Sequence, residues 1–198
     1  VVGGFSNSDV LGSAKGWAGA FLYNQKAKQA LDNFYAREDT LSLGVCNGCQ
    51  LMTELGLITP ELSEKPAMLH NESHKFESAF VNVTIPENNS VMLGNLSGQR
   101  LGVWIAHGEG KFSLPGDKSN YNFAMNYSYE AYPGNPNGSD YATAGIASKD
   151  GRHLAMMPHI ERSLKPWNWP HYPADRSDDF TPRLEAFIKA RKWVEKHS

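Results

Sequence analysis

Apolar side chains recur every three or four positions in several stretches of the chain, which is the spacing of one buried face of an α-helix. The clearest stretch covers residues 25–37, and its apolar face is formed by Ala27, Ala30, Leu31, Phe34 and Tyr35. Asn24 stands where a helix-capping side chain is favoured. The pattern therefore predicts an amphipathic helix that begins after Asn24.

Three further helices are predicted. One covers 17–23, and another covers 47–55, where Gly56 and Pro60 end it. The last begins at Thr181-Pro182, because proline is favoured in the first turn of a helix. Its buried side is predicted to carry Leu184, Phe187, Ile188 and Val194.

Five short apolar or alternating runs have the pattern of β-strands. They cover residues 41–45, 76–85, 102–107, 143–148 and 152–157. The last two flank Asp150-Gly151, a dipeptide typical of tight hairpins. Because helices and strands alternate along the chain, we predict an α/β fold in a single domain of residues 1–198. The opening Val1-Val2-Gly3-Gly4 has the pattern of the end of a buried strand, so we expect the chain to be part of a longer polypeptide.

Composition argues against several classes of protein. The 198 residues are 40% hydrophobic and carry a formal net charge of −2, whereas a dedicated nucleic-acid-binding protein usually has a basic surplus. No apolar stretch approaches the roughly 20 residues that span a bilayer, and no signal peptide is visible. Two cysteines are too few for a disulfide framework. We therefore expect a cytoplasmic protein that binds neither nucleic acid nor membrane.

Both cysteines lie in one heptapeptide, Gly44-Val45-Cys46-Asn47-Gly48-Cys49-Gln50, between a predicted strand and a predicted helix. Gly44 and Gly48 stand two positions before and after Cys46, which is the spacing of a nucleophile elbow, whose tight turn requires small neighbours. Cys46 would project over a helix N-terminus, where the helix dipole favours the reactive thiolate. Cys49 lies one turn inside the helix and is expected to be a packing residue.

The C-x-x-C spacing leaves two other interpretations open. Such a pair can be a redox dithiol or half of a zinc site. A zinc site would need further ligands, and the chain offers no more cysteines and one close histidine pair, His70 and His74. We expect these two histidines to be exposed to solvent and predict no metal site.

A cysteine nucleophile requires a base, and the base requires an orienting group. His159 and Glu161 follow the predicted strand 152–157 and are two positions apart, so their side chains leave an extended chain on the same side. By itself the pair is equally consistent with a loop histidine beside an unrelated glutamate. Together with the elbow it favours a catalytic triad of Cys46, His159 and Glu161.

Backbone N–H groups near the elbow are candidates for stabilising an oxyanion. The amide of Asn47 follows the nucleophile, and Gly4 follows the first apolar run, where glycine lets the backbone approach a ligand closely. The loop His107-Gly108-Glu109-Gly110 follows another strand, and open α/β sheets bind ligands at such strand ends. The glycine-rich phosphate loops G-x-x-x-x-G-K-[ST] and G-x-G-x-x-G are both absent, so we expect no nucleotide bound through them.

This set of motifs resembles the class I (triad-type) glutamine amidotransferases. The heptapeptide 44–50 resembles their nucleophile motif, and Pro158-His159 with Glu161-Arg162 resembles their His-Glu motif. Further segments resemble the branch of the family that serves a purine-biosynthesis synthase, namely Gly3-Gly4-Phe5-Ser6, Asp9-Val10-Leu11-Gly12, Gly16-Trp17-Ala18, His107-Gly108-Glu109-Gly110 and Asn135-Pro136-Asn137-Gly138-Ser139. The resemblance covers nearly the whole chain.

The resemblance implies a flavodoxin-like three-layer α/β sandwich with a mostly parallel sheet, from which the family's N-terminal strand and helix are missing. It implies a glutaminase in which Cys46 attacks glutamine, His159 transfers the proton and Glu161 orients His159. The residues implied to hold glutamine are Gln50, His107, Gly108 and Glu109. No cofactor is implied for this chain. ATP and Mg²⁺ would serve a separate synthetase region of the same polypeptide, which would receive the ammonia.

Two positions depart from the family pattern. Ile160 stands where the family usually has proline, which would leave the loop less rigid. Asn7-Ser8 stands where the family often has an aromatic residue and a glycine, which would alter the segment near Gly4. Two other functions therefore stay open, namely a Cys-His-Glu hydrolase of another γ-glutamyl bond and a non-catalytic binding module of the same fold.

Overall fold

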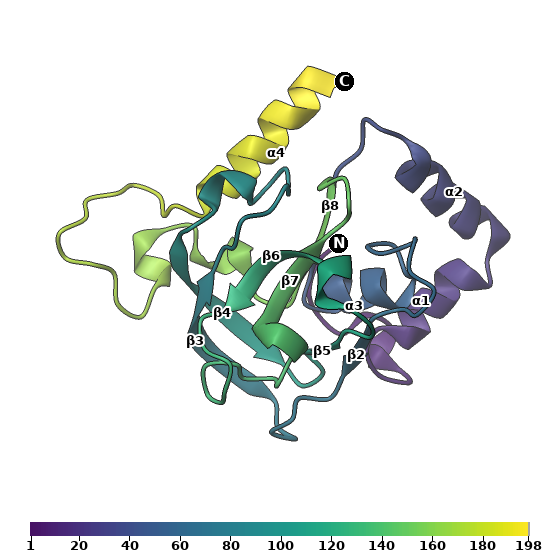
Figure 1. The fold of residues 1–198 in the computed structure, drawn as a ribbon, viewed down its shortest axis with the longest axis horizontal. Helices are drawn as coiled ribbons and strands as arrows, with labels where there is room; N and C mark the ends of the chain where they lie inside the picture. Colours follow the sequence, from purple (N-terminus) through teal and green to yellow (C-terminus); the bar gives the residue numbers. More distant parts are fainter. Residues whose placement is uncertain (198) are drawn as a thin grey trace.

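The computed structural model describes residues 1–197, and its centre is a six-stranded sheet in the order β1, β8, β7, β6, β3, β4 (Figure 1). The strands of this sheet are β1 (Ser42–Val45), β3 (Glu77–Thr84), β4 (Arg100–His107), β6 (Asn122–Tyr127), β7 (Thr143–Ala147) and β8 (His153–Met156). A separate antiparallel pair is formed by β2 (Ala67–Leu69) and β5 (Lys111–Ser113).

The large sheet is mixed. Only β1 and β8 pair in parallel among the described strands, while the other neighbours in the sheet run antiparallel. The α/β class is confirmed, but the prediction of a mostly parallel sheet is wrong. A parallel pair needs a crossover of a dozen or more residues, whereas the short turn at Asp150-Gly151 reverses the chain between β7 and β8.

Four α-helices surround the sheet, namely α1 (Lys15–Leu22), α2 (Gln25–Ala36), α3 (Asn47–Glu54) and α4 (Leu184–His197). The predicted cap of α2 is confirmed, because Asn24 Oδ1 accepts hydrogen bonds from the N–H groups of Lys26 and Ala27. On α4 the buried residue is Ala186, whereas Val194, which was predicted to be buried, is 41% exposed. None of the helices in residues 1–197 is both long and apolar enough to cross a membrane.

Six short 3₁₀ turns connect these elements. They are η1 (Ser6–Asp9), η2 (Gly94–Leu96), η3 (Lys118–Asn120), η4 (Asp140–Ala142), η5 (Ile160–Ser163) and η6 (Pro166–Asn168). The hydrophobic core includes buried side chains of β1, α3, β3, β4 and β8, such as Met52, Val83, Val103, Ile105 and Leu154. Because α3 packs on both β1 and β8, the start of this helix is fixed against the edge of the sheet.

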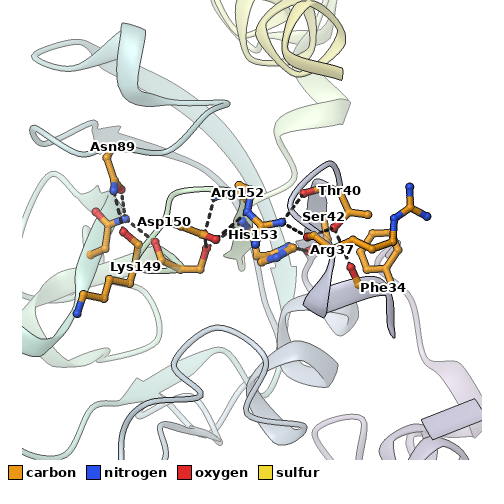
Figure 2. A network of polar contacts seen from close by, with 11 residues as sticks. Phe34, Arg37, Thr40, Ser42, Asn89, Lys149, Asp150, Arg152 and His153 are labelled. Carbon is orange, nitrogen blue, oxygen red and sulfur yellow. Dashed lines mark hydrogen bonds and ion pairs between the residues drawn. The ribbon is translucent and has the colours of Figure 1, made fainter. Parts of the chain in front are cut away.

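A polar network fixes the N-terminal end of β1 (Figure 2). Arg152 binds the Asp150 carboxylate through Nε at 2.7 Å, and its Nη1 donates to the Arg37 and Thr40 carbonyls. His153 Nδ1 lies 2.9 Å from Ser42 Oγ, at the first residue of β1. These contacts tie the β7–β8 turn to the segment before β1, so the parallel pairing of β1 and β8 is anchored at the end opposite Cys46.

Gly44 is an elbow position at which the fold does not tolerate a side chain. A Cβ atom there would clash with Met52 Sδ and lie 2.7 Å from the Gly48 carbonyl oxygen. We expect Gly44→Ala to lower the free energy of unfolding by about 1–3 kcal/mol, since overpacking forces backbone shifts. Urea denaturation followed by circular dichroism measures this change.

Gly19→Ala is the matched control, because a Cβ atom at this position in α1 would meet only Tyr23 ring carbons, at 3.7 and 3.8 Å. Alanine is the better helix residue there, so this variant should gain up to about 1 kcal/mol. Equal stability of the two variants would contradict the packing argument for Gly44.

Candidate active site

Cys46 occupies a strained turn between β1 and α3. Its backbone has φ 52° and ψ −108°, a conformation that costs a non-glycine residue on the order of 1–3 kcal/mol. Two hydrogen bonds hold the turn: Cys46 N–H donates to the Met156 carbonyl at 2.9 Å, and Gln50 N–H donates to the Cys46 carbonyl at 3.0 Å. The predicted elbow geometry is therefore present, with Cys46 directly before the first residue of a helix.

The two cysteines have different surroundings. Cys46 lines a cavity, and its Sγ lies 3.6 Å from the Ala106 carbonyl oxygen at the end of β4. Cys49 is fully buried inside α3, and burial raises the pKa of its thiol well above the ordinary value. Both thiols are free. Cys49 is inaccessible and does not line the cavity, so the geometry favours the single-nucleophile interpretation of the motif.

His159 lies against Cys46 just beyond the end of β8. A Cβ atom on Gly3 would be 3.2 Å from Cys46 Cβ and 2.7 Å from His159 Cε1, so the backbone of Gly3 packs against both side chains at once. The backbone N–H of His159 donates to the Trp104 carbonyl at 2.8 Å, which holds this residue beside β4. The imidazole is only 2% exposed.

Glu161 provides the partner of His159. Its Oε1 lies 2.6 Å from His159 Nδ1, while the intervening Ile160 turns into the core. Burial alone would lower the pKa of His159, but hydrogen bonds and charges from Cys46 and Glu161 outweigh burial and raise this pKa to about 9. Burial acts to raise the pKa of Glu161, yet the hydrogen bond from His159 helps bring it below its ordinary value. The arrangement is that of an imidazolium held by a carboxylate.

The cavity beside Cys46 has a volume of about 490 Å³. It contains all four residues predicted to hold the substrate, together with Gly4 from the predicted oxyanion site. Its lining is Gly4, Phe5, Asp9, Gly12, Cys46, Gln50, His70, His74, Lys75, Phe76, Ala106, His107, Gly108 and Glu109. A cavity of this size accommodates a small polar molecule.

Gln50 and Glu109 are held in place by hydrogen bonds around the cavity. Gln50 Nε2 donates to the Glu109 carbonyl at 2.7 Å, and Gln50 Oε1 accepts from Asn47 Nδ2 at 2.8 Å. The Glu109 carboxylate accepts from Ser13 Oγ at 2.7 Å and from Ser13 N–H. His70, which is exposed as predicted, approaches Glu109 Oε1 to 3.4 Å. The wall thus joins α3, the loop after β4 and the N-terminal loop.

Asn71 organises the segment around His107, and an ordinary Asn-x-Ser triplet is all that marks it in the sequence. Its Nδ2 donates to the carbonyls of His107 at 2.7 Å and Lys75 at 2.9 Å, so its Oδ1 must be an acceptor. That oxygen accepts from Gly110 N–H at 3.0 Å and lies 3.2 Å from His107 Nδ1. Burial, with a contribution from His159, lowers the pKa of His107 to about 4. His107 is therefore a neutral ring that carries its proton on Nδ1.

The two predicted oxyanion residues lie on either side of a hydrogen-bonded link between the N-terminal loop and α3. Gly4 lines the cavity with φ 135°, and Asn47 is the first residue of α3, whose N–H has no acceptor within the helix. The Asn47 side chain accepts from Ser6 N–H at 3.0 Å and donates to Asp9 Oδ1 at 3.0 Å. Asp9, which sequence analysis did not single out as a site residue, thus ties the loop to the residue after Cys46.

The family model and the sequence relatives that match this chain agree with each other. A family model for the CobB/CobQ-like glutamine amidotransferase domain matches residues 1–194. Phosphoribosylformylglycinamidine synthases from Dictyostelium discoideum and Homo sapiens are 46% and 42% identical, each over 98% of the chain. The chain spans only 16% of the length of either synthase.

Solved structures agree with the fold. A structure described as PurLQS from Thermotoga maritima superposes with a TM-score of 0.70 at 26% identity, covering 97% of this chain and 77% of that one. A glutamine amidotransferase from the same organism superposes with a TM-score of 0.51 at 17% identity, covering 98% of this chain and 62% of that one, which bears on the fold alone. The predicted flavodoxin-like α/β class is confirmed, with a mixed sheet.

The charge of His159 can be tested directly. We expect His159 to titrate near pH 9 in a histidine-labelled NMR spectrum, and its pKa to fall in Glu161→Gln, because the neutral amide stabilises the imidazolium less. Since the folded pKa exceeds the unfolded value of about 6.5, the imidazolium stabilises the folded state fully below that pH. This contribution is lost as the pH rises through about 9.

The same titration of His107 is the internal control, because this ring should stay neutral down to about pH 4 in both proteins. A His159 that titrates at its ordinary value in the unsubstituted protein would contradict the ion-pair description of the site.

Proposed function

The chain belongs to the family of CobB/CobQ-like glutamine amidotransferase domains, and we propose that it is the glutaminase domain of a phosphoribosylformylglycinamidine synthase. In this role residues 1–198 form one domain of a longer polypeptide that acts in purine biosynthesis. The domain hydrolyses glutamine to glutamate and ammonia. Its identity of 42–46% with two such synthases over 98% of its length supports this choice of enzyme.

The observation that carries the proposal is that Cys46 lines the cavity, while His159 packs against Gly3 together with Cys46 and is held by Glu161. The strained turn presents the sulfur at a helix N-terminus, which stabilises negative charge. The imidazole, held by Glu161 at 2.6 Å, supplies the positive partner at neutral pH. An imidazolium beside Cys46 is an acid that can protonate the leaving group once the sulfur has attacked.

The first half of the reaction forms a thioester. The Cys46 thiolate attacks the side-chain carbonyl carbon of glutamine, and the carbonyl oxygen becomes an oxyanion. His159 transfers its proton to the amide nitrogen, the carbon–nitrogen bond breaks, and ammonia leaves. In the second half, His159 takes a proton from water, and the resulting hydroxide attacks the thioester. Glutamate leaves with its carboxyl proton lost to solvent, the Cys46 sulfur departs as the thiolate, and His159 keeps the proton taken from water, which regenerates the starting state.

The cavity supplies the groups that hold the substrate in this proposal. The backbone N–H groups of Gly4 and Asn47 are assigned to the oxyanion, since both residues adjoin Cys46 or its cavity. Gln50, His107, Gly108 and Glu109 are assigned to glutamine. The carboxylate of Glu109 can attract the substrate ammonium group, whereas His107 acts as a neutral part of the wall.

The ammonia has a destination outside this chain. We assign it to a synthetase region of the same polypeptide, which would use ATP and Mg²⁺ to convert formylglycinamide ribonucleotide into its amidine. The share of 16% that the chain represents in its curated relatives leaves ample length for such a region. No cofactor is assigned to the glutaminase domain itself, and the whole enzyme is assigned to the cytoplasm.

Substitution of the two cysteines tests the nucleophile in the polypeptide that carries this chain. We expect Cys46→Ala to abolish glutamate release, because no other thiol borders the cavity within residues 1–197. Cys49→Ala should retain most of the activity, since it removes only a buried sulfur. Mass spectrometry of acid-quenched enzyme should show one glutamyl group on Cys46 after mixing with glutamine.

Three results would contradict the assignment. Loss of activity in Cys49→Ala alone would transfer the role to that residue, and equal loss in both variants would revive the dithiol interpretation. A thioester that forms with another γ-glutamyl compound but not with glutamine would identify a different hydrolase of the same fold.

Kinetics of Glu161→Gln test the orienting role. We expect kcat to fall about 100-fold or more with little change in glutamine binding, because the loss lies in imidazolium stabilisation and in the orientation of the imidazole. Addition of His159→Ala to this variant should cost little more, since the members of a triad act as a unit. Fully additive losses measured in the double variant would show that Glu161 acts elsewhere.

A further inference from the structure

Arg183 is a fully buried cation that contacts η5, the 3₁₀ turn that contains Glu161. Sequence analysis did not single it out. It precedes α4 at the end of a long loop that follows η6 (Figure 1). Within residues 1–197 no carboxylate lies within 4 Å of its guanidinium, and its Nε and Nη2 have no hydrogen-bond acceptor. Its positive charge instead faces the Trp169 ring, whose centroid is 4.1 Å from Cζ.

Within the described residues, the Arg183 side chain makes one hydrogen bond, and this bond is directed at η5. Nη1 donates to the Ser163 carbonyl at 3.0 Å. The same oxygen accepts from Thr181 Oγ1 at 2.6 Å and from Trp169 Nε1 at 3.2 Å. Three donors from the following loop thus converge on the last residue of η5, the turn that contains Glu161.

A role in stability alone does not account for this arginine. Removing a guanidinium from water is unfavourable, and an apolar side chain of similar volume in such a site is often neutral or stabilising. Burial lowers the pKa of Arg183 to about 9, so the side chain remains charged at neutral pH and this cost persists. An arginine at this position can donate a hydrogen bond to the Ser163 carbonyl, whereas a methionine cannot.

We propose that Arg183 is a positioning residue for Glu161, which holds η5 through the Ser163 carbonyl so that the carboxylate remains on His159 Nδ1. The Glu161 side chain is 42% exposed and its other ion pair, with Arg162 Nε at 3.8 Å, is long. Among residues 1–197, this long ion pair is the one side-chain contact besides His159 that holds the carboxylate. Its position depends on the backbone of a four-residue turn, whose C-terminal end is fixed by the three donors.

The consequence for activity rests on the proposed glutaminase function. A displacement of a positioned group by about 1 Å can cost on the order of 100-fold in rate. The charge on His159 should respond as well, because its pKa depends on Glu161 and Cys46, with His107 as the other titratable group beside it. If Glu161 drifts from Nδ1, the imidazolium loses its partner and its pKa falls.

Arg183→Met in the full polypeptide is the test. We expect an unchanged or higher melting temperature, a kcat for glutamate release lower by about 10- to 100-fold, and an unchanged KM for glutamine. The alkaline limb of the pH–kcat profile reports the imidazolium that protonates the leaving ammonia. This limb should move to lower pH in the variant, which a merely structural role would not produce.

Two further variants keep the test decisive. Thr181→Val preserves shape and charge but removes another donor to Ser163, so it should shift the alkaline limb in the same direction even if Arg183→Met folds poorly. Arg183→Lys, which can still donate to the carbonyl, should recover part of kcat. The control is Arg191→Met, at an arginine on α4 whose side chain is 81% exposed. This variant should change neither kcat nor the position of the alkaline limb.

The outcomes separate this proposal from the proposed function. If the unsubstituted enzyme releases no glutamate and is not labelled at Cys46 by the chloroketone analogue of glutamine, the glutaminase assignment itself fails. If that enzyme is active, a normal alkaline limb in both Arg183→Met and Thr181→Val overturns the positioning role alone. A drop in kcat that only parallels a loss of melting temperature also overturns it.

Discussion

The parallel pairing of β1 with β8 is the constraint on which the site depends. Parallel strands end at the same edge of a sheet, so the residues that follow both strands meet there. Cys46 follows β1 directly and donates its N–H to Met156, the last residue of β8. His159 comes three residues after that strand. A slip of one residue in this register would turn every side chain of β1 to the other face and separate the two.

The charge states of His107 and His159 differ although the two rings are buried close together. Two imidazolium ions beside each other would repel, and the site avoids this by giving the rings different partners. Asn71 offers His107 an amide oxygen, while Glu161 offers His159 a full negative charge. One ring is therefore neutral and structural, and the other is charged and able to transfer a proton. The difference arises because burial keeps His107 neutral, whereas Cys46 and Glu161 outweigh burial at His159.

Sequence patterns predicted those features that are encoded locally. The helix after Asn24, the elbow around Cys46 and the hairpin at Asp150-Gly151 each depend on residues within a few positions of one another, and each is present in the structure. The strand β6 was missed, because Asn122 and Asn126 interrupt its apolar pattern and its pairing with β7 is irregular. The mixed sheet was missed as well, since strand direction depends on connections between distant segments.

The polar residues that shape the site were the hardest to predict. Asn71 and Arg183 act through backbone carbonyls, which carry no side-chain identity that a sequence could reveal. The proposed roles of Cys46, His159 and Glu161 rested on spacing and resemblance, and the structure adds the 2.6 Å contact between His159 and Glu161 and the packing of Gly3 against both Cys46 and His159. The role of a buried polar side chain can be assigned only when its hydrogen-bond partner is known. A nucleophile elbow, in contrast, can be predicted from the glycines that its turn requires.

The N-terminal loop shows how strain near a site is sustained. Asn7, Ser8 and Asp9 all have φ between 51° and 54°, the left-handed region that costs an L-residue roughly 1–2 kcal/mol. The loop keeps this shape because Asn47 accepts from Ser6, Asp9 caps the N–H of Ala14, and Glu109 binds Ser13. Two of these anchors, Asp9 and Glu109, also line the cavity. Any change that draws Asp9 or Glu109 toward a bound molecule must weaken a contact that offsets the strain, so the position of Gly4 is coupled to the contents of the cavity.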